Sequence, residues 1–327
     1  MKIWSRTGAA LAAVALLVSG CGGSDSDSDG GGSGGGGDGG PITLRVADTN
    51  GAPLYFLKYG IEQGFFEDAG VELEATASSG GATVIPQLVS GDLDIAGSNV
   101  VSVLIARSQG LPLKMVAAGT STSEDPEQDF SALMVPAGSP ITDIGQLEGQ
   151  KVAVNTLRNI NDIVLGHMLE DAGLSFDSVE LVEIPFPDMA AAIESGDVAA
   201  GVLIEPFITV AEQQGLTIIG RPYSDLKPGL QIGTYVMTEQ FVNENPDAVS
   251  AFQEGVQATA DAIADDPDAF RAALPQLGDI SPELADQVRI NLWKGETDQE
   301  SLELIQGLMT TYGLIDEEVD LDELVVG

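Results

Sequence analysis

Two short polar loops carry most of the side chains that could hold a small molecule. Each loop follows an expected strand and precedes an expected helix, so each offers free backbone N–H groups and the positive end of a helix to a ligand. The candidate ligand-binding residues in these loops are Asn50, Gly51, Ala52, Asn155, Thr156, Arg158 and Asn159. The alternative is that they only cap helices and form turns, where Asn, Thr and Gly are favoured in any case.

Two charged residues would determine the electrostatic character of such a site. Arg158 stands in a turn at an expected helix start, where the helix dipole gives a cation no favourable role, and its guanidinium could clamp a sulfonate, carboxylate or phosphate. Glu205 ends an apolar strand and could accept hydrogen bonds from an amine or an aminopyrimidine. If both face a cleft, the ligand carries both signs, as taurine or an amino acid does. For Arg158 the alternative is a solvated side chain or a salt bridge to one of the many acids, and for Glu205 it is a salt bridge in the hinge region or a cap.

Five more residues stand just after expected strands and complete the candidate site. They are Gly80, Gly81, Ser98, Asn99 and Thr120. Ligands of open α/β sheets bind beyond the carboxyl ends of the strands, which is where these residues would lie. Tyr55 and Phe56 could stack on a planar ligand, but their place on an expected helix favours a role in the core.

The composition leaves little room for catalysis, metal binding or nucleic-acid binding. The chain has one cysteine, Cys21, and one histidine, His167, so neither a Cys/His zinc site nor a Cys–His catalytic pair is expected. We therefore expect no catalytic residue, no metal and no cofactor. A net charge of −38, from 13 basic and 51 acidic residues, repels phosphate backbones and argues against a nucleic-acid partner.

An alternation of strands and helices must position these loops, and it predicts an α/β fold. The length of 327 residues suits two α/β lobes. Short apolar runs predict strands over 42–47, 71–76, 93–97, 113–118, 131–135, 151–154, 179–184, 198–204, 217–219 and 232–237. Helices are expected over 53–68, 82–89, 100–108, 162–172, 187–194, 245–264, 268–274, 282–293 and 299–312.

An internal repeat indicates that the two lobes have a like topology. Glu67-Asp68-Ala69-Gly70 recurs as Glu170-Asp171-Ala172-Gly173, and Ser90-Gly91-Asp92 recurs as Ser195-Gly196-Asp197. The offsets are 103 (170 − 67) and 105 (195 − 90) residues. Each glycine alone suits a helix C-cap, but two similar units at a near-constant offset favour a repeated fold.

The start of the chain has the pattern of an export signal. Lys2 and Arg6 flank an apolar stretch over 7–18 that is short for a membrane span and typical of a signal-peptide core. It ends in Leu17-Val18-Ser19-Gly20-Cys21, which resembles the bacterial lipobox, where cleavage before the cysteine leaves it N-terminal and diacylated. Residues 22–40 are almost wholly Gly, Ser and Asp, which predicts a flexible tether. An ordinary signal peptide with an incidental cysteine is the alternative.

The folded part resembles a family of ABC-transporter solute-binding proteins, the branch for sulfonates, taurine, nitrate and thiamine-pyrimidine precursors. The resemblance runs over about residues 43–241. The segments that carry it are 53–56 (PLYF), 63–66 (QGFF), 69–73 (AGVEL), 90–96 (SGDLDIA), 146–154 (QLEGQKVAV), 190–200 (AAAIESGDVAA) and 205–207 (EPF). Each motif is soft, but their order and spacing together are fairly specific.

The resemblance implies a periplasmic-binding-protein type 2 clamshell, in which each lobe is a mostly parallel sheet flanked by helices. We expect a signal peptide over 1–20, a lipidated Cys21 with its tether over 21–40, a first lobe over 41–128 plus 225–327, and a second lobe over 129–224. The first lobe would include the C-terminal helices. Crossover segments near 124–130 and 222–232 would act as the hinge.

The resemblance also implies the function and the partners. The expected protein is a monomer on the extracytoplasmic face of the cell membrane, anchored by palmitate-type acyl chains. It would capture a sulfonate-, taurine- or nitrate-like anion, or a heterocyclic pyrimidine precursor, by hinge closure and deliver it to ABC permease subunits and their ATPase.

Two alternatives remain. One is a ligand-sensing lipoprotein of the same fold. The other is an enzyme like the thiamine-pyrimidine synthase of this fold, which consumes an active-site histidine within a cysteine-rich motif. The chain's single histidine, expected inside a helix, and its single cysteine, in the lipobox, disfavour the enzyme.

Overall fold

The computed structural model describes residues 42–278 and 280–326. The predicted signal peptide, the lipidated Cys21 and the tether lie outside the described residues. A first sheet has the strand order β2-β1-β3-β11-β4. Its strands are β1 (Ile42–Thr49), β2 (Val71–Ser78), β3 (Ile95–Asn99), β4 (Leu113–Ala118) and β11 (Gly233–Thr238).

A second sheet has the strand order β10-β6-β9-β7-β8. Its strands are β6 (Ser131–Val135), β7 (Lys151–Val154), β8 (Glu180–Glu183), β9 (Ala200–Ile204) and β10 (Thr217–Gly220). Written from the other edge, this order is β8-β7-β9-β6-β10, which matches the first sheet strand for strand. The like topology that the internal repeat predicts is therefore present. The two Ser-Gly-Asp motifs of the repeat also form the same hydrogen bond. Ser90 Oγ donates to Asp92 over 2.8 Å, and Ser195 Oγ donates to Asp197 over 2.9 Å.

Four strands of each sheet run in one direction and the fifth runs against them. In the first sheet β11 is antiparallel to both neighbours, and in the second sheet β6 is. Both are the first strands entered after the chain crosses from the other sheet. The expectation of mostly parallel sheets is thus confirmed for strand direction, and the fold belongs to the α/β class.

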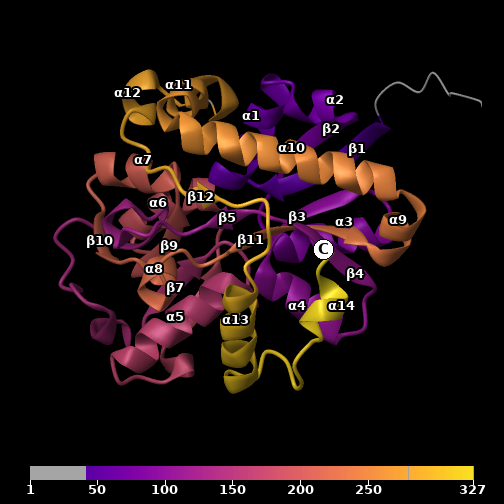
Figure 1. Cartoon of the computed structure of the whole chain (residues 1–327). Helices are drawn as coiled ribbons and strands as arrows, with labels where there is room; N and C mark the ends of the chain where they lie inside the picture. The colour runs from indigo at the N-terminus through magenta and orange to yellow at the C-terminus, as the bar shows by residue number, and fades with distance from the viewer. Residues whose placement is uncertain (1–41, 279, 327) are drawn as a thin grey trace, which may run out of the picture. The chain divides into compact units, whose positions relative to one another are not determined.

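Helices cover both faces of each sheet (Figure 1). On the first sheet, α1 (Ala52–Glu62), α2 (Phe65–Ala69) and the long α10 lie on one face, with α3 (Gly81–Ser90) and α4 (Val100–Ser108) on the other. On the second sheet, α6 (Phe186–Ser195) and α7 (Phe207–Gln213) lie opposite α5 (Ile160–Asp171) and α8 (Pro222–Leu226). The helix expected over 53–68 is two helices, because the chain turns at Gly64 with a left-handed φ of 80°.

The C-terminal part is mainly helical. It comprises α9 (Glu239–Glu244), α10 (Pro246–Asp265), α11 (Pro267–Gly278), α12 (Pro282–Ala285), α13 (Gln299–Thr311) and α14 (Leu321–Leu324). The helix expected over 282–293 is wrong. Only its first four residues are helical, and Leu292 and Trp293 form β12, which pairs with β5 (Thr120–Ser121). Tertiary pairing with a distant strand overrides the local helical pattern there.

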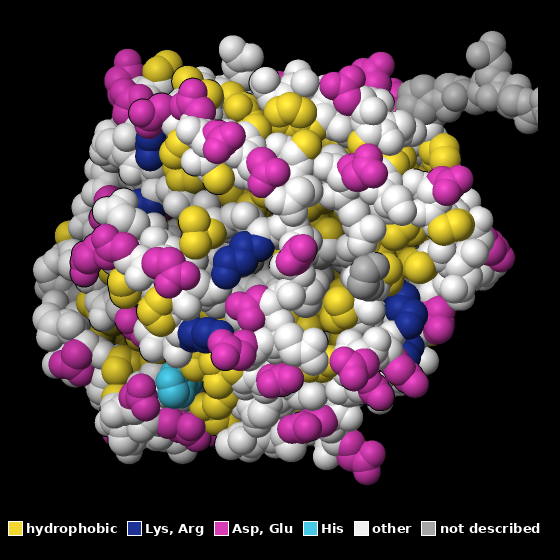
Figure 2. Space-filling view, in the orientation of Figure 1, with side chains coloured by type: hydrophobic (Ala, Val, Ile, Leu, Met, Phe, Trp, Pro, Cys, Tyr) yellow, Lys and Arg dark blue, Asp and Glu magenta, His cyan; other side chains and the backbone are white. Residues whose placement is uncertain are grey.

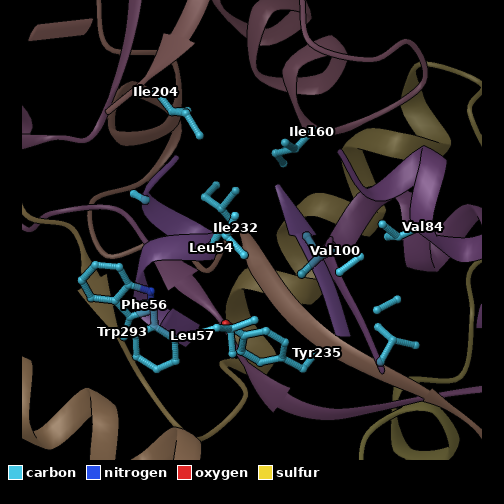
Figure 3. Packing of buried hydrophobic residues seen from close by; sticks show 14 of the residues in the cluster. Leu54, Phe56, Leu57, Val84, Val100, Ile160, Ile204, Ile232, Tyr235 and Trp293 are labelled. Carbon is cyan, nitrogen blue, oxygen red and sulfur yellow. The ribbon is translucent and has the colours of Figure 1, made fainter. Parts of the chain in front are cut away.

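Aromatic side chains anchor this C-terminal part in the core of the first lobe. The rings of Phe56 and Trp293 stack with centroids 5.2 Å apart, and Figure 3 shows them side by side. Phe56 is fully buried, and Trp293 is 8 % exposed. The expectation that Phe56 belongs to the core is therefore met. No helix in the described ranges has both the length and the apolarity needed to cross a bilayer.

Candidate functional site

A cavity lies between the two sheets, at the edge where the parallel strands end. Its walls come from the ends of β1, β3 and β9, the segments that follow β4 and β7, and the start of β11. The lining residues are Asp48, Thr49, Pro53, Ser98, Asn99, Gly119, Thr120, Phe130, Asn155, Asn159, Ile160, Phe186, Ile204, Tyr223, Ile232, Gly233, Thr234 and Tyr235. The carboxyl edge of both sheets therefore forms one site, as the strand-end rule predicts.

The cavity is narrow and is closed by contacts between the lobes. It leaves about 40 Å³ for the centres of water-sized molecules. Figure 3 shows Ile160 and Ile204 of the second lobe on one side and Ile232 on the other. Across its mouth, Asn155 Nδ2 donates to the Ser79 carbonyl over 2.8 Å, and the Ala52 amide donates to the Glu205 carbonyl over 3.0 Å. The lobes thus lie in contact around a narrow, partly open space.

Two crossover segments run side by side at the back of the cavity. The Gly119 amide donates to the Gly233 carbonyl over 2.9 Å, and the Ile232 amide donates to the Thr120 carbonyl over 2.9 Å. A Cβ on Gly233 would lie 2.7 Å from the Thr120 nitrogen, so only glycine fits this close approach. The two segments join the lobes as one narrow ribbon, which is a suitable place for a hinge.

Five of the predicted ligand-binding residues line the cavity: Ser98, Asn99, Thr120, Asn155 and Asn159. The asparagines are partly committed to the protein itself. Asn155 Oδ1 accepts from Asn159 and Asn161, and Asn161 in turn accepts from the Tyr223 hydroxyl over 2.8 Å. This network holds the N-terminus of α5 against the cavity. Asn99 caps α4 by accepting from the Ser102 amide over 3.0 Å.

Six further predicted residues border the cavity without lining it. They are Asn50, Gly51, Ala52, Gly80, Gly81 and Thr156. Several of these residues bring the lobes close together. A Cβ on Gly51 would lie 2.9 Å from the Glu205 carbonyl oxygen, and one on Gly80 would lie 2.5 Å from Asn155 Nδ2. Thr156 is buried and accepts a short hydrogen bond from Asn159.

The two charged candidates lie elsewhere. The Arg158 guanidinium donates to the Leu314 carbonyl over 3.2 Å, and the backbone of Arg158 is left-handed, with a φ of 56°. Glu205 is fully buried, accepts from Thr209 at the start of α7, and pairs with Arg289 over 3.0 Å. Burial raises the pKa of Glu205 despite these partners. The structure therefore does not bring Arg158 and Glu205 together around one ligand.

Among the residues that the structure describes, Asp48 is the one acidic residue that lines the cavity, and no Lys, Arg or His lines it. The side chain is 5 % exposed, and burial raises its pKa to about 7. Sequence reasoning placed Asp48 in the right loop but did not select it. An acid at the last buried position of a strand was the available signal. The aromatic residues Phe130, Phe186, Tyr223 and Tyr235, which also line the cavity, come from four separate segments and had no such signal.

Comparison with known proteins agrees with this architecture. The alkanesulfonate-binding protein SsuA from Xanthomonas axonopodis pv. citri, solved with MOPS bound, superposes with a TM-score of 0.75 at 16 % identity, covering 88 % of this chain and 99 % of that one. The fold is that of a periplasmic binding protein. A sequence model of the family described as NMT1/THI5 like matches residues 48–270, and the chain belongs to this family.

The curated relatives of this chain include proteins named as binding proteins and proteins named as enzymes. A putative aliphatic sulfonates-binding protein of Escherichia coli strain K12 is 27 % identical over 187 residues, 56 % of this chain and 54 % of that protein. The 4-amino-5-hydroxymethyl-2-methylpyrimidine phosphate synthase THI12 of Saccharomyces cerevisiae is 24 % identical over 219 residues, 63 % of this chain and 62 % of the yeast protein. The chain therefore spans between half and two thirds of the length of these relatives.

Proposed function

We propose that this protein is the extracytoplasmic solute-binding component of an ABC importer. The observation that carries the proposal is the narrow cavity at the carboxyl edges of two sheets, with walls from both lobes and a narrow two-segment connection. A solute that binds between lobes joined in this way favours the closed arrangement by its contacts with both. The closed protein would then present the solute to permease subunits that act with an ATPase.

The cavity also guides the choice between binding and catalysis. His167, the single histidine, lies on α5 with its Nε2 3.6 Å from Asp171, and it does not line the cavity. The synthase-like reaction considered above consumes a histidine at the site. We therefore propose binding and release of an unchanged solute, with no catalytic residue and no cofactor.

Anchoring of the protein at the membrane is part of the same proposal. Cys21 follows an apolar stretch and a lipobox-like sequence, which supports diacylation of the mature N-terminus and attachment to the outer face of the cell membrane. The Gly-, Ser- and Asp-rich residues 22–40 would let a monomeric binding unit reach the permease.

Native mass spectrometry of the purified chain tests the binding function directly. The protein should carry one small solute per chain, or take up one from a panel of sulfonates, nitrate, amines and aminopyrimidines. Covalent change of the solute during incubation would contradict a pure binding role. A chain that neither retains nor binds any member of the panel would contradict the proposal.

A further inference from the structure

The carboxyl group of Asp48 is built into the first sheet next to the cavity. Asp48 is the last buried residue of β1, and β1 lies between β2 and β3. On β3 the neighbouring residue is Gly97, and a Cβ there would lie 2.2 Å from Asp48 Cγ. Any side chain at position 97 would therefore displace the carboxyl group. The pairing of Asp48 with Gly97 holds one acid at a fixed place in the cavity wall.

The protein satisfies only part of the hydrogen-bonding capacity of this carboxylate. The Thr49 amide donates to Asp48 Oδ1 over 2.7 Å, and the Tyr235 hydroxyl is a second partner. An ionised carboxylate accepts about four hydrogen bonds, so acceptor capacity remains on the side that faces the cavity. Neither of these partners carries a positive charge.

No cationic side chain among the described residues that line the cavity offsets the negative charge of the ionised Asp48 carboxylate. The titratable residues lining the cavity are Asp48, Tyr223 on α8 and Tyr235 on β11. Burial raises the pKa of both tyrosines, so both stay neutral hydroxyls. When Asp48 is ionised, a simple oxyanion would meet a negative charge and no cation in this narrow site, which costs free energy. A ligand nitrogen that carries hydrogen would supply the missing partner.

We propose that the solute presents an N–H group to the Asp48 carboxylate, which makes it an amine or an amino-substituted heterocycle rather than a simple oxyanion. The inference rests on the proposed function, because it concerns the solute of the same cavity. Apolar and aromatic walls, including Phe130 and Phe186, suit the carbon part of such a ligand.

Two matched pairs of compounds test this chemistry on the full chain in a mild detergent. Taurine is compared with ethanesulfonate, and 4-aminopyrimidine with 4-methylpyrimidine, since the second member of each pair lacks the amino group and has no other N–H. The amino member of at least one pair should raise the unfolding midpoint by several degrees at saturation, and its partner should not. The pair that responds distinguishes an ammonium group from an aromatic amine.

Two variants tie the effect to the carboxylate. Asp48→Asn keeps the size of the side chain and should abolish the shift caused by the amino compound. Asp265→Asn removes the same charge from an exposed residue of α10 and should leave the shift unchanged. The midpoint of each variant without ligand shows whether it is folded.

The pH dependence adds an independent readout. Burial raises the pKa of Asp48 to about 7, so a positively charged amine must displace a proton from it below that pH. The dissociation constant of taurine should therefore rise about tenfold per pH unit below pH 7. Asp48→Asn should show no binding of taurine at any pH in that range.

Three results would overturn the inference. Equal shifts from ethanesulfonate and taurine that persist in Asp48→Asn would leave the binding function intact and refute the role of Asp48. Binding of 4-methylpyrimidine in preference to 4-aminopyrimidine would have the same meaning. Failure of all four compounds to bind, when the chain takes up a solute of the wider panel that has no N–H group, would refute this inference and leave the proposed function intact.

Discussion

At the scale of single residues, the buried carboxyl of Asp48 should control part of the pH dependence of stability. Its pKa of about 7 lies above the ordinary value of 3.8, so the folded state holds an extra proton between these two pH values. Unfolding releases that proton, and stability falls as the pH rises through this window. The loss is complete near pH 7 and absent below pH 4.

Replacing Asp48 by Asn removes this contribution. The free energy of unfolding of the wild type, minus that of Asp48→Asn, should fall between pH 4 and pH 7 with a slope of up to about 1.4 kcal/mol per pH unit. Urea unfolding of both proteins at pH 4, 5, 6 and 7, without ligand, measures the difference. A difference that does not change with pH would show that Asp48 has an ordinary pKa.

Arg158 illustrates how a residue can look like a ligand contact and lie outside the cavity. Its guanidinium donates to the Leu314 carbonyl, near the C-terminal end of the chain. We expect Arg158→Ala to change the dissociation constant of the bound solute by less than about twofold, which is below about 0.4 kcal/mol. Isothermal titration with the best-binding compound measures this. A hundredfold loss would restore the anion clamp that the sequence favours.

At the scale of secondary-structure elements, two ion pairs of Arg289 join the two lobes within the described part of the chain. Arg289 lies between α12 and β12 of the first lobe, and its guanidinium contacts Glu205 and Glu212 of the second lobe at 3.0 and 2.9 Å. Glu205 is fully buried, so loss of Arg289 would leave its carboxyl without a charged partner. The two pairs therefore favour the arrangement in which the lobes touch.

We expect Arg289→Leu to lower the free energy of unfolding by about 3 kcal/mol and to weaken solute binding. Arg271→Leu is the matched control, because Arg271 pairs only with Asp268 on the same helix, α11, and should cost less than about 1 kcal/mol. Urea unfolding and titration of both variants measure the two effects. Similar behaviour of the two variants would show that the interlobe pairs have no special role.

At the scale of the whole molecule, solute binding should tighten the contacts between the lobes. The Ala52 amide donates to the Glu205 carbonyl of the other lobe, and this bond exists only while the lobes touch. We expect the exchange of this amide with deuterium to slow at least tenfold when a solute is bound. Amide exchange followed by NMR measures it. An unchanged exchange rate would indicate that the lobes do not separate in the free protein.

Attachment to the membrane gives a prediction of its own. Acyl chains on Cys21 would hold the mature protein at the membrane, because two chains together bind far more stably than one. We expect Cys21→Ser to move the protein from the membrane fraction to the soluble fraction of the producing bacterium, with solute affinity unchanged. Fractionation followed by immunoblotting measures this. A variant that stays in the membrane fraction would refute the lipid anchor.

The sequence by itself determined the fold class, the order of the elements and the region of the site. Strands over 113–118, 131–135 and 151–154 lie where their mainly apolar runs predict them, because a buried strand needs a mainly apolar segment. The repeated Ser-Gly-Asp motif predicted two units of like topology, and the two sheets have the same strand order. Polar loops after these strands were located correctly, since loop chemistry is local.

Only the tertiary structure decided which side chains face the cavity. Asp48 and Tyr235 are 187 residues apart (235 − 48), and they meet because β11 returns from the second lobe to lie beside β3. Trp293 was expected in a helix but lies in strand β12, because this segment pairs with β5. The orientation of the Arg158 side chain depends on its hydrogen bond to the Leu314 carbonyl in the C-terminal segment. Local pattern carries no information on such distant partners, so the sign and chemistry of the cavity emerge only when the chain is folded.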